Sequence, residues 1–167
     1  GADGTENLYF ATQCKTLDGG LDEQIRGFIR EHPDTGLIII DTLKRVREVG
    51  GADYSYASDY DVVAKLKALA DSCNIAMLIV HHTRKQQAGD KFDTISGTNG
   101  LLGAADGAFV LSKEKRTSNN ATLDITGRDQ PDQRIQLVKD PETLVWNFEK
   151  AETCLLYTSE LPTILLV

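Results

Sequence analysis

The chain has 167 residues, an ordinary size for one domain with its own core, and its hydrophobic share of 41% excludes a disordered chain. A formal net charge of -7 argues against a wholly basic nucleic-acid cradle, although a local basic loop can still bind DNA. The three cysteines have neither metal-ligand nor disulfide spacing, and no stretch approaches the roughly 20 apolar residues of a membrane span, so we predict a cytoplasmic protein.

The first elements are predicted to be a strand, a helix and a second strand. Residues 7–13 are rich in strand-favouring side chains, and a turn signal follows at residues 18–20. From Leu21 the apolar residues recur with the period of a helix, which Pro33 and Gly36 end. A strand, a helix and a parallel strand make one right-handed crossover unit.

The Leu-Ile-Ile-Ile-Asp stretch at residues 37–41 is the most informative part of the sequence. An unbroken aliphatic run predicts a strand that is buried on both faces, in the middle of a parallel sheet. Asp41 then lies at the carboxyl edge of the sheet, where α/β proteins bind ligands and where P-loop NTPases hold magnesium. The alternative is an ordinary buried strand followed by a capping or turn aspartate.

A second strand and a polar edge follow a predicted helix. After a loop or short turn at residues 42–47, Ser58 marks the start of an amphipathic helix that Asn74 ends. The apolar run at residues 75–80 predicts another central strand, and His81-His82-Thr83-Arg84-Lys85 follows it directly. These donor-rich side chains should lie at the same edge as Asp41. An ordinary loop is an equal alternative, and a zinc site is a weaker one because no third histidine or cysteine is near.

The remaining elements are shorter. Residues 86–95 are predicted to form a polar loop, residues 101–105 a short helix and residues 108–111 a third apolar strand. Three further segments alternate as antiparallel strands do, at residues 121–126, 134–138 and 144–148. The predicted fold is therefore α/β, with a parallel core flanked by helices and followed by an antiparallel meander.

The order of these features resembles that of the RecA-like ATPases. A strand ending in Asp41, a strand followed by His81, then Ser96-Gly97-Thr98 and Gly127-Arg128-Asp129 occur in the family's order, over about residues 7–148. The likeness is strongest to the RepA-type hexameric replicative helicases, often called AAA family ATPases. The resemblance implies a RecA-like P-loop NTPase core in a domain spanning residues 1–150. It also implies an ATP-dependent DNA helicase or translocating ATPase of plasmid or phage replication that uses ATP and magnesium.

The resemblance also implies roles for particular residues. Asp41 matches the Walker B aspartate, which would hold magnesium through water, and Thr42 and His82 would lie at the nucleotide with it. His81 matches the position of a sensor that reports hydrolysis to the adjacent loop. Arg128 matches the basic residue of a hairpin that reaches the nucleotide of a neighbouring subunit in a homo-hexamer, a role that suits a permanently charged guanidinium. A turn residue paired with its neighbour is the alternative for Arg128.

The predicted polar loop matches the segment that faces the central channel in this family. Lys85 and Lys91 would there meet the phosphates of single-stranded DNA, unless they are solvated surface residues. RepA-like proteins carry an arginine just before the glycine that is Gly97 here, and this chain has Ser96 in its place. The resemblance therefore implies that the arginine acting on the nucleotide of a neighbouring subunit is Arg128.

The family's phosphate-binding loop, G-x-x-x-x-G-K-[ST], does not occur in the 167 residues. The family places that loop and the water-activating glutamate upstream of residues 7–13. We therefore expect the chain to be the carboxyl-terminal part of a longer ATPase and to be inactive alone. Residues 151–167 lack a periodic face and are predicted to be a non-native tail.

Two other classes of function are alternatives to the ATPase. A RecA-fold regulatory or DNA-binding module without ATP turnover is the main alternative. A parallel α/β phosphoacceptor or flavin domain is disfavoured, because the antiparallel meander and the His-His-Thr-Arg edge would have no role in it.

Overall fold

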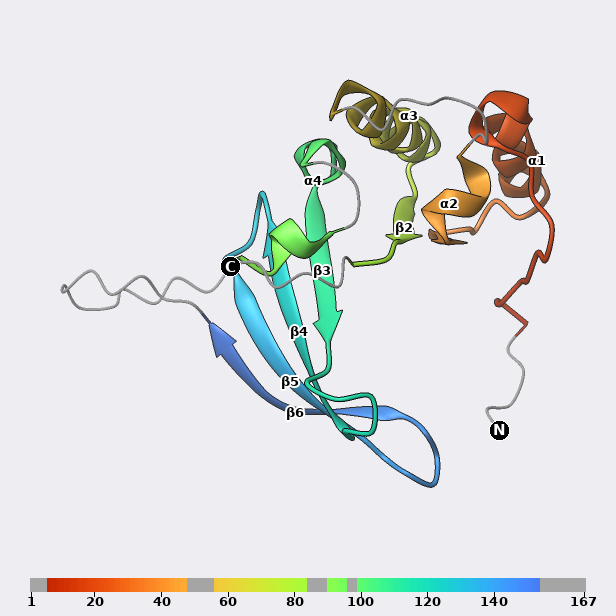
Figure 1. The fold of residues 1–167 in the computed structure, drawn as a ribbon. Coiled ribbons are helices and arrows are strands. Elements are labelled where there is room, and N and C mark those ends of the chain that lie inside the picture. The colour runs from red at the N-terminus through yellow and green to blue at the C-terminus, as the bar shows by residue number, and fades with distance from the viewer. Residues whose placement is uncertain (1–5, 48–55, 84–89, 96–98, 154–167) are drawn as a thin grey trace, which may run out of the picture. The chain divides into compact units, whose positions relative to one another are not determined.

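The structure, a computed structural model, describes residues 6–47, 56–83, 90–95 and 99–153. The chain divides into two compact units, Gly1–Ala108 and Phe109–Val167. The first unit contains a two-stranded parallel sheet with the described helices, and the second is built on an antiparallel sheet (Figure 1). This mixed α/β architecture is the predicted fold class.

The first unit follows the predicted order of elements from the helix at Leu21 onward. Its elements are the π-helical turn η1 Leu17–Leu21, α1 Asp22–Glu31, β1 Leu37–Asp41, α2 Leu43–Val46, α3 Tyr56–Cys73, β2 Ala76–Val80, η2 Phe92–Thr94 and α4 Gly100–Ala104. β1 and β2 pair in parallel, from Leu37 opposite Ala76 to Asp41 opposite Val80. The two predicted central strands are therefore confirmed as neighbours.

The core of the first unit is made by apolar stripes of the helices together with one side of the sheet. The apolar residues of α3 recur at helical spacing, which turns one side of that helix inward. The large buried members of this core are Leu21, Ile25, Ile40, Leu43, Val46, Val63, Leu66, Leu69 and Leu101. α2 and α3 thus share one core with the strand that ends at Asp41.

The prediction of a strand at residues 7–13 is wrong, because these residues form no strand in the structure. Tyr9 and Phe10 are 55% and 85% exposed. The Tyr9 ring instead packs against α1, 5.4 Å from the Phe28 ring and 4.2 Å from the imidazole of His32 (centroid distances). Strand-favouring residues form a strand only where a pleated, half-buried surface receives them, and no strand of the described residues pairs with this segment.

The prediction that β1 is buried on both faces is also wrong. Ile40 is 8% exposed, whereas Leu37 and Ile39 are 52% and 56% exposed. Side chains alternate between the two faces of a strand, so the residues that the structure describes cover only the face that carries Ile38 and Ile40. An unbroken aliphatic run identified the strand correctly, but it could not tell whether both faces would be covered.

α3 begins earlier than predicted and ends where predicted. The helix is already formed at Tyr56, so Ser58 lies inside it and is not its cap. The Ser58 hydroxyl accepts a hydrogen bond from Nη2 of Arg47 at 2.8 Å, which explains why a serine is found there without a capping role. Asn74 follows the last helical residue with a φ of 52°, the left-handed conformation that commonly ends helices.

The second unit contains the predicted meander. β3 Gly107–Ser112, β4 Asn120–Gly127, β5 Gln133–Lys139 and β6 Trp146–Thr153 lie side by side in that order. The β4–β5 and β5–β6 pairs are antiparallel. The third apolar strand therefore forms, and it joins this sheet, while the parallel sheet of the described residues contains β1 and β2.

The last strand is displaced relative to the prediction. It begins at Trp146 and not at Leu144, because Leu144 has a φ of 61° and closes the preceding turn. It continues to Thr153, which pairs with Gln133, so the strand runs three residues past the predicted domain end at Lys150. Residues 154–167 lie outside the described part of the chain, and a non-native tail there stays a prediction.

The turn between β5 and β6 gives a prediction about pH. The Asp140 carboxylate accepts hydrogen bonds from the N–H groups of Thr143 at 2.9 Å and Glu142 at 2.8 Å, and these lower the pKa of Asp140 below its ordinary value of 3.8. Because the folded-state pKa is depressed, the stability that these bonds contribute is present above the unfolded value and is lost as pH falls through the folded pKa. NMR titration of the carboxyl carbon should give a midpoint below 3.8. A midpoint at or above the ordinary value would contradict this assignment.

Candidate functional site

The carboxyl ends of β1 and β2 bring a carboxylate and an imidazole to one edge of the sheet. Asp41 pairs with Val80, the last residue of β2, and His81 follows at once. Asp41 is exposed and His81 is half-buried. The peptide bond between Asp41 and Thr42 is cis. Asp41 and His81 therefore lie at the same end of one parallel sheet, where the sequence predicts them.

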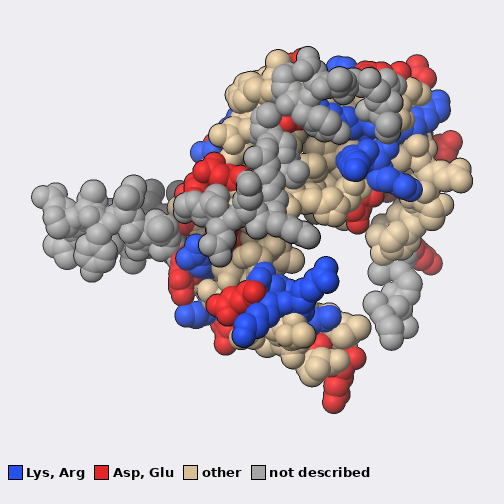
Figure 2. Space-filling model, in the orientation of Figure 1, with Lys and Arg blue, Asp and Glu red and all other residues tan. Residues whose placement is uncertain are grey.

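A short basic helix leads away from Asp41. Leu43 and Val46 are 2% and 1% exposed and anchor α2 in the core, while Lys44 and Arg45 are exposed. Figure 2 shows Lys and Arg side chains gathered over the part of the first unit where α2 lies. Cations beside a carboxylate suit a ligand that carries both phosphate groups and a metal ion.

A buried ion pair closes α2 against α3. Nη1 of Arg47 lies 2.6 Å from Oδ1 of Asp59, whose side chain is 0% exposed, and Nη2 of Arg47 donates to the Ser58 hydroxyl. This pair was not predicted from the sequence. Asp59 precedes the buried Val63 by one helical turn on the apolar side of α3, and a carboxylate on such a stripe is the signal that could have revealed it.

The predicted DNA-facing loop ends at the same edge, and its first residues, 86–89, lie outside the described part of the chain. Thr83 forms an isolated antiparallel bridge with Ile95, so the two ends of the intervening segment lie together beside the end of β2. His82 is exposed, and Lys91 is half-buried just before η2, with its carbonyl accepting the N–H and hydroxyl of Thr94. Lys85 lies outside the described residues, so its placement stays a prediction.

Arg128 belongs to the second unit, so it is in a different unit from Asp41 and His81. It follows Gly127, the last residue of β4, and is exposed in the turn that leads to β5. The Thr126 hydroxyl donates to Oδ1 of Asp132 at 2.6 Å and closes this turn at its base. The hairpin therefore presents Arg128 on its exposed turn.

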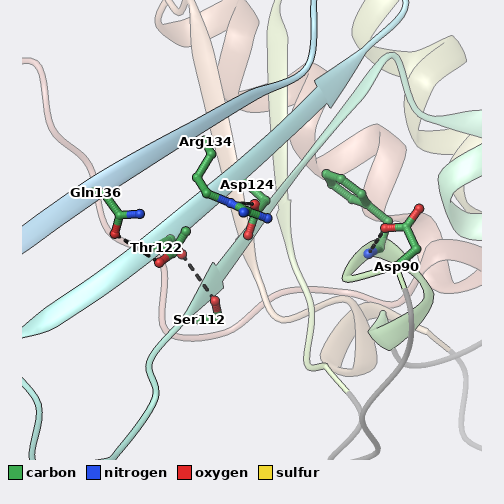
Figure 3. A network of polar contacts seen from close by, with 7 residues as sticks. Asp90, Ser112, Thr122, Asp124, Arg134 and Gln136 are labelled. Atoms are coloured by element: carbon green, nitrogen blue, oxygen red, sulfur yellow. Dashed lines mark hydrogen bonds and ion pairs between the residues drawn. The ribbon is translucent and has the colours of Figure 1, made fainter. Parts of the chain in front are cut away.

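A polar network, which was also not predicted from the sequence, holds the strands of this hairpin in register. Nε of Arg134 lies 2.7 Å from Oδ1 of Asp124, which is 5% exposed, and these two residues are paired across β4 and β5. The Thr122 hydroxyl donates to Oε1 of Gln136 at 3.2 Å two pairs further along (Figure 3). A one-residue slip would leave the buried Asp124 carboxylate without its cation, so this network resists a change of register.

The donor set at the sheet edge fits magnesium in one respect. Magnesium is usually bound by one or two carboxylates together with phosphate oxygens and water, and Asp41 supplies an exposed carboxylate. Among the described residues there is no group of three or more His, Cys, Asp or Glu that could hold a metal on protein ligands alone.

In the same part of the chain, no helix combines the length and apolar character needed to span a membrane.

A family model described as "AAA domain" matches residues 5–88, which is half of the chain, and the chain belongs to that family. The match includes both parallel strands, α2, α3 and the polar edge with Asp41 and His81. No curated protein matches the chain.

Two solved structures share the fold. The first is an ATPase domain, with 18% sequence identity and a TM-score of 0.65, and the match covers 80% of this chain and 51% of that one. The second is a DnaB-like replicative helicase studied with its primase interactions, with 17% identity and a TM-score of 0.64 over 77% of this chain and 34% of that one. This likeness confirms the predicted RecA-like α/β fold. The chain spans only about half and about a third of the lengths of these two proteins.

Proposed function

We propose that the protein containing this chain is an ATP-dependent DNA helicase or DNA-translocating ATPase of plasmid or phage replication, of the RepA type. The observation that carries the proposal is the parallel pairing of Asp41 with Val80 in a chain of the AAA domain family. This pairing puts Asp41 and His81 at the ends of neighbouring strands, at the edge where α/β proteins bind ligands. The likeness to a DnaB-like replicative helicase supports the same class of function.

In this proposal Asp41 holds the magnesium of ATP through water, and Thr42 and His82 lie beside the nucleotide. When bound, magnesium neutralises charge on the transferred phosphoryl group. His81 is half-buried and lies just before the segment between Thr83 and Ile95, and in this proposal it reports the state of the nucleotide to that segment. The proposal requires a phosphate-binding loop outside these 167 residues, because none occurs within them.

DNA and neighbouring subunits complete the proposed site. Lys85 and Lys91 meet the phosphates of single-stranded DNA, and Arg128 reaches the nucleotide of the next subunit in a homo-hexamer. The exposed turn between β4 and β5, held by the Asp124–Arg134 pair, suits a residue that must extend to another molecule. A guanidinium suits phosphate because it stays charged and donates in a planar fork.

The test is ATP hydrolysis by the full-length protein, measured with and without oligo(dT) and with blunt duplex DNA as control. We expect magnesium-dependent turnover that single-stranded DNA stimulates more than duplex does, with a stimulation that weakens as salt rises because phosphate contacts release counterions. DNA binding without any turnover would contradict the proposal and would favour a regulatory or DNA-binding module.

A further inference from the structure

We propose that the ion pair between Arg47 and Asp59 positions Asp41 for ATP turnover, which makes both members positioning residues of the sheet edge. This inference rests on the proposed ATPase function. It assigns the buried pair a task in holding the end of α2, and not in stabilising the first unit as a whole.

Stability alone is a poor explanation for this pair. The Asp59 side chain is 0% exposed and that of Arg47 is 19% exposed, so both charges have lost most of their water. The cost of removing two charges from water often exceeds their attraction, and well-packed apolar replacements of such pairs are commonly neutral or stabilising. Because burying this pair contributes little net stability, we explain its presence by a need to hold the end of α2 in one defined position.

The path of the backbone shows what that arrangement holds. Asp41 ends β1, and α2 runs from Leu43 to Val46, so only a short, ordered stretch separates Asp41 from Arg47. Both ends of α2 are buried in the core, and the N–H of Arg47 donates to the carbonyl of Leu43 at 3.1 Å. If Arg47 moves, α2 therefore moves with it and shifts Asp41.

The other member of the pair stands on a rigid element. Asp59 is in the first turns of an 18-residue helix whose Val63 and Leu66 are buried in the same core. Arg47 binds Asp59 and Ser58 through different nitrogens, at 2.6 and 2.8 Å, which fixes the orientation of the guanidinium as well as its distance. α3 thereby sets where α2 lies, and α2 sets where the carboxylate of Asp41 is presented.

The experiment compares stability with turnover in the full-length protein. The double variant Arg47→Met with Asp59→Leu replaces the pair by apolar side chains, and Asp59→Asn removes one charge with little change of shape. We measure the urea unfolding midpoint, kcat and KM for ATP, the magnesium concentration for half-maximal rate, and hydrogen exchange of the amides of residues 41–47. The matched control is Lys65→Met with Asp18→Leu, which removes an exposed pair between α3 and η1, 2.9 Å long.

We expect the double variant to unfold at the wild-type midpoint while kcat falls by about 10- to 100-fold, because a misplacement of about 1 Å can cost about 100-fold in rate. Its half-maximal magnesium concentration should rise, and exchange should become faster across α2. Asp59→Asn should lower kcat more than it raises KM. The control should keep the wild-type kcat and exchange pattern.

Three outcomes overturn the inference. One is a double variant with wild-type kcat, magnesium dependence and exchange. Another is a loss of kcat that follows the loss of folded protein in every variant, including Asp59→Asn. The third is unchanged exchange across α2 in the variants, which can be read whether or not ATP is hydrolysed. A wild-type protein that does not hydrolyse ATP would instead refute the proposed function itself, so the two failures are distinguishable.

Discussion

Replacing Asp41 by alanine in the full-length protein should reduce magnesium-dependent ATP hydrolysis by about 100-fold, the upper end of the roughly 10- to 100-fold that metal-site partners acting through bound water typically contribute. The fold should survive, because Asp41 is exposed at the end of β1 and contributes no side chain to the core. Exposed substitutions usually change stability by about 0.5 kcal/mol or less. Steady-state turnover and urea unfolding of the same preparations measure both parts.

Asp34→Ala is the matched control for this experiment. Asp34 is also exposed and lies before β1, whereas Asp41 ends that strand, so the two substitutions remove the same charge near opposite ends of one element. We expect the Asp34 variant to hydrolyse ATP at the wild-type rate. Equal rates for wild type and the Asp41 variant would refute the magnesium role.

Replacing Arg128 by alanine should lower kcat by about 10³- to 10⁵-fold, the range for arginines that stabilise the transferred phosphoryl group from a neighbouring subunit. Arg128 is exposed in the turn after β4, so its loss should leave the second unit folded. Arg128→Lys keeps the charge but loses the planar fork, and should recover only part of the rate. Arg116→Ala, which removes an exposed arginine from the turn between β3 and β4, should keep the wild-type rate.

A mixing experiment tests whether Arg128 acts between subunits. Asp41→Ala subunits keep Arg128, and Arg128→Ala subunits keep Asp41, so a mixed assembly contains interfaces with both groups intact. We expect mixtures of the two inactive variants to regain ATP hydrolysis. No recovery in mixtures that are shown to co-assemble, for example by native mass spectrometry, would place both residues in the same subunit's site or remove Arg128 from the reaction.

The position of the proposed site was predictable because it depends on local patterns and on one general rule. Two apolar runs, each followed by polar residues, mark the ends of β1 and β2. The carboxyl ends of parallel strands meet at one edge, and this puts Asp41 and His81 at the same end of the sheet without any knowledge of side-chain contacts. The hairpin with Arg128 was predictable in the same way, from the alternation of β4 and β5.

The pairs that hold these elements were not predictable from local patterns. Arg47 and Asp59 are separated by 12 positions and belong to different helical segments, so no periodicity relates them. Asp124 and Arg134 meet only because β4 and β5 pair in one particular register. The prediction of a strand at residues 7–13 was wrong for the same reason. Strand-favouring side chains need a neighbouring strand, and the Tyr9 ring packs against the rings of α1 instead.

The sequence by itself determined which segments after residue 20 become helices and strands, and which polar residues follow the parallel strands. These properties depend on neighbouring residues along the chain, whose spacing sets which side chains share a face. Only the tertiary structure decided that one face of β1 is covered, that β3 joins the antiparallel sheet, and that Asp59 is buried against Arg47. Those outcomes depend on which distant surfaces meet, and burial is a property of the packed chain that a local pattern does not contain.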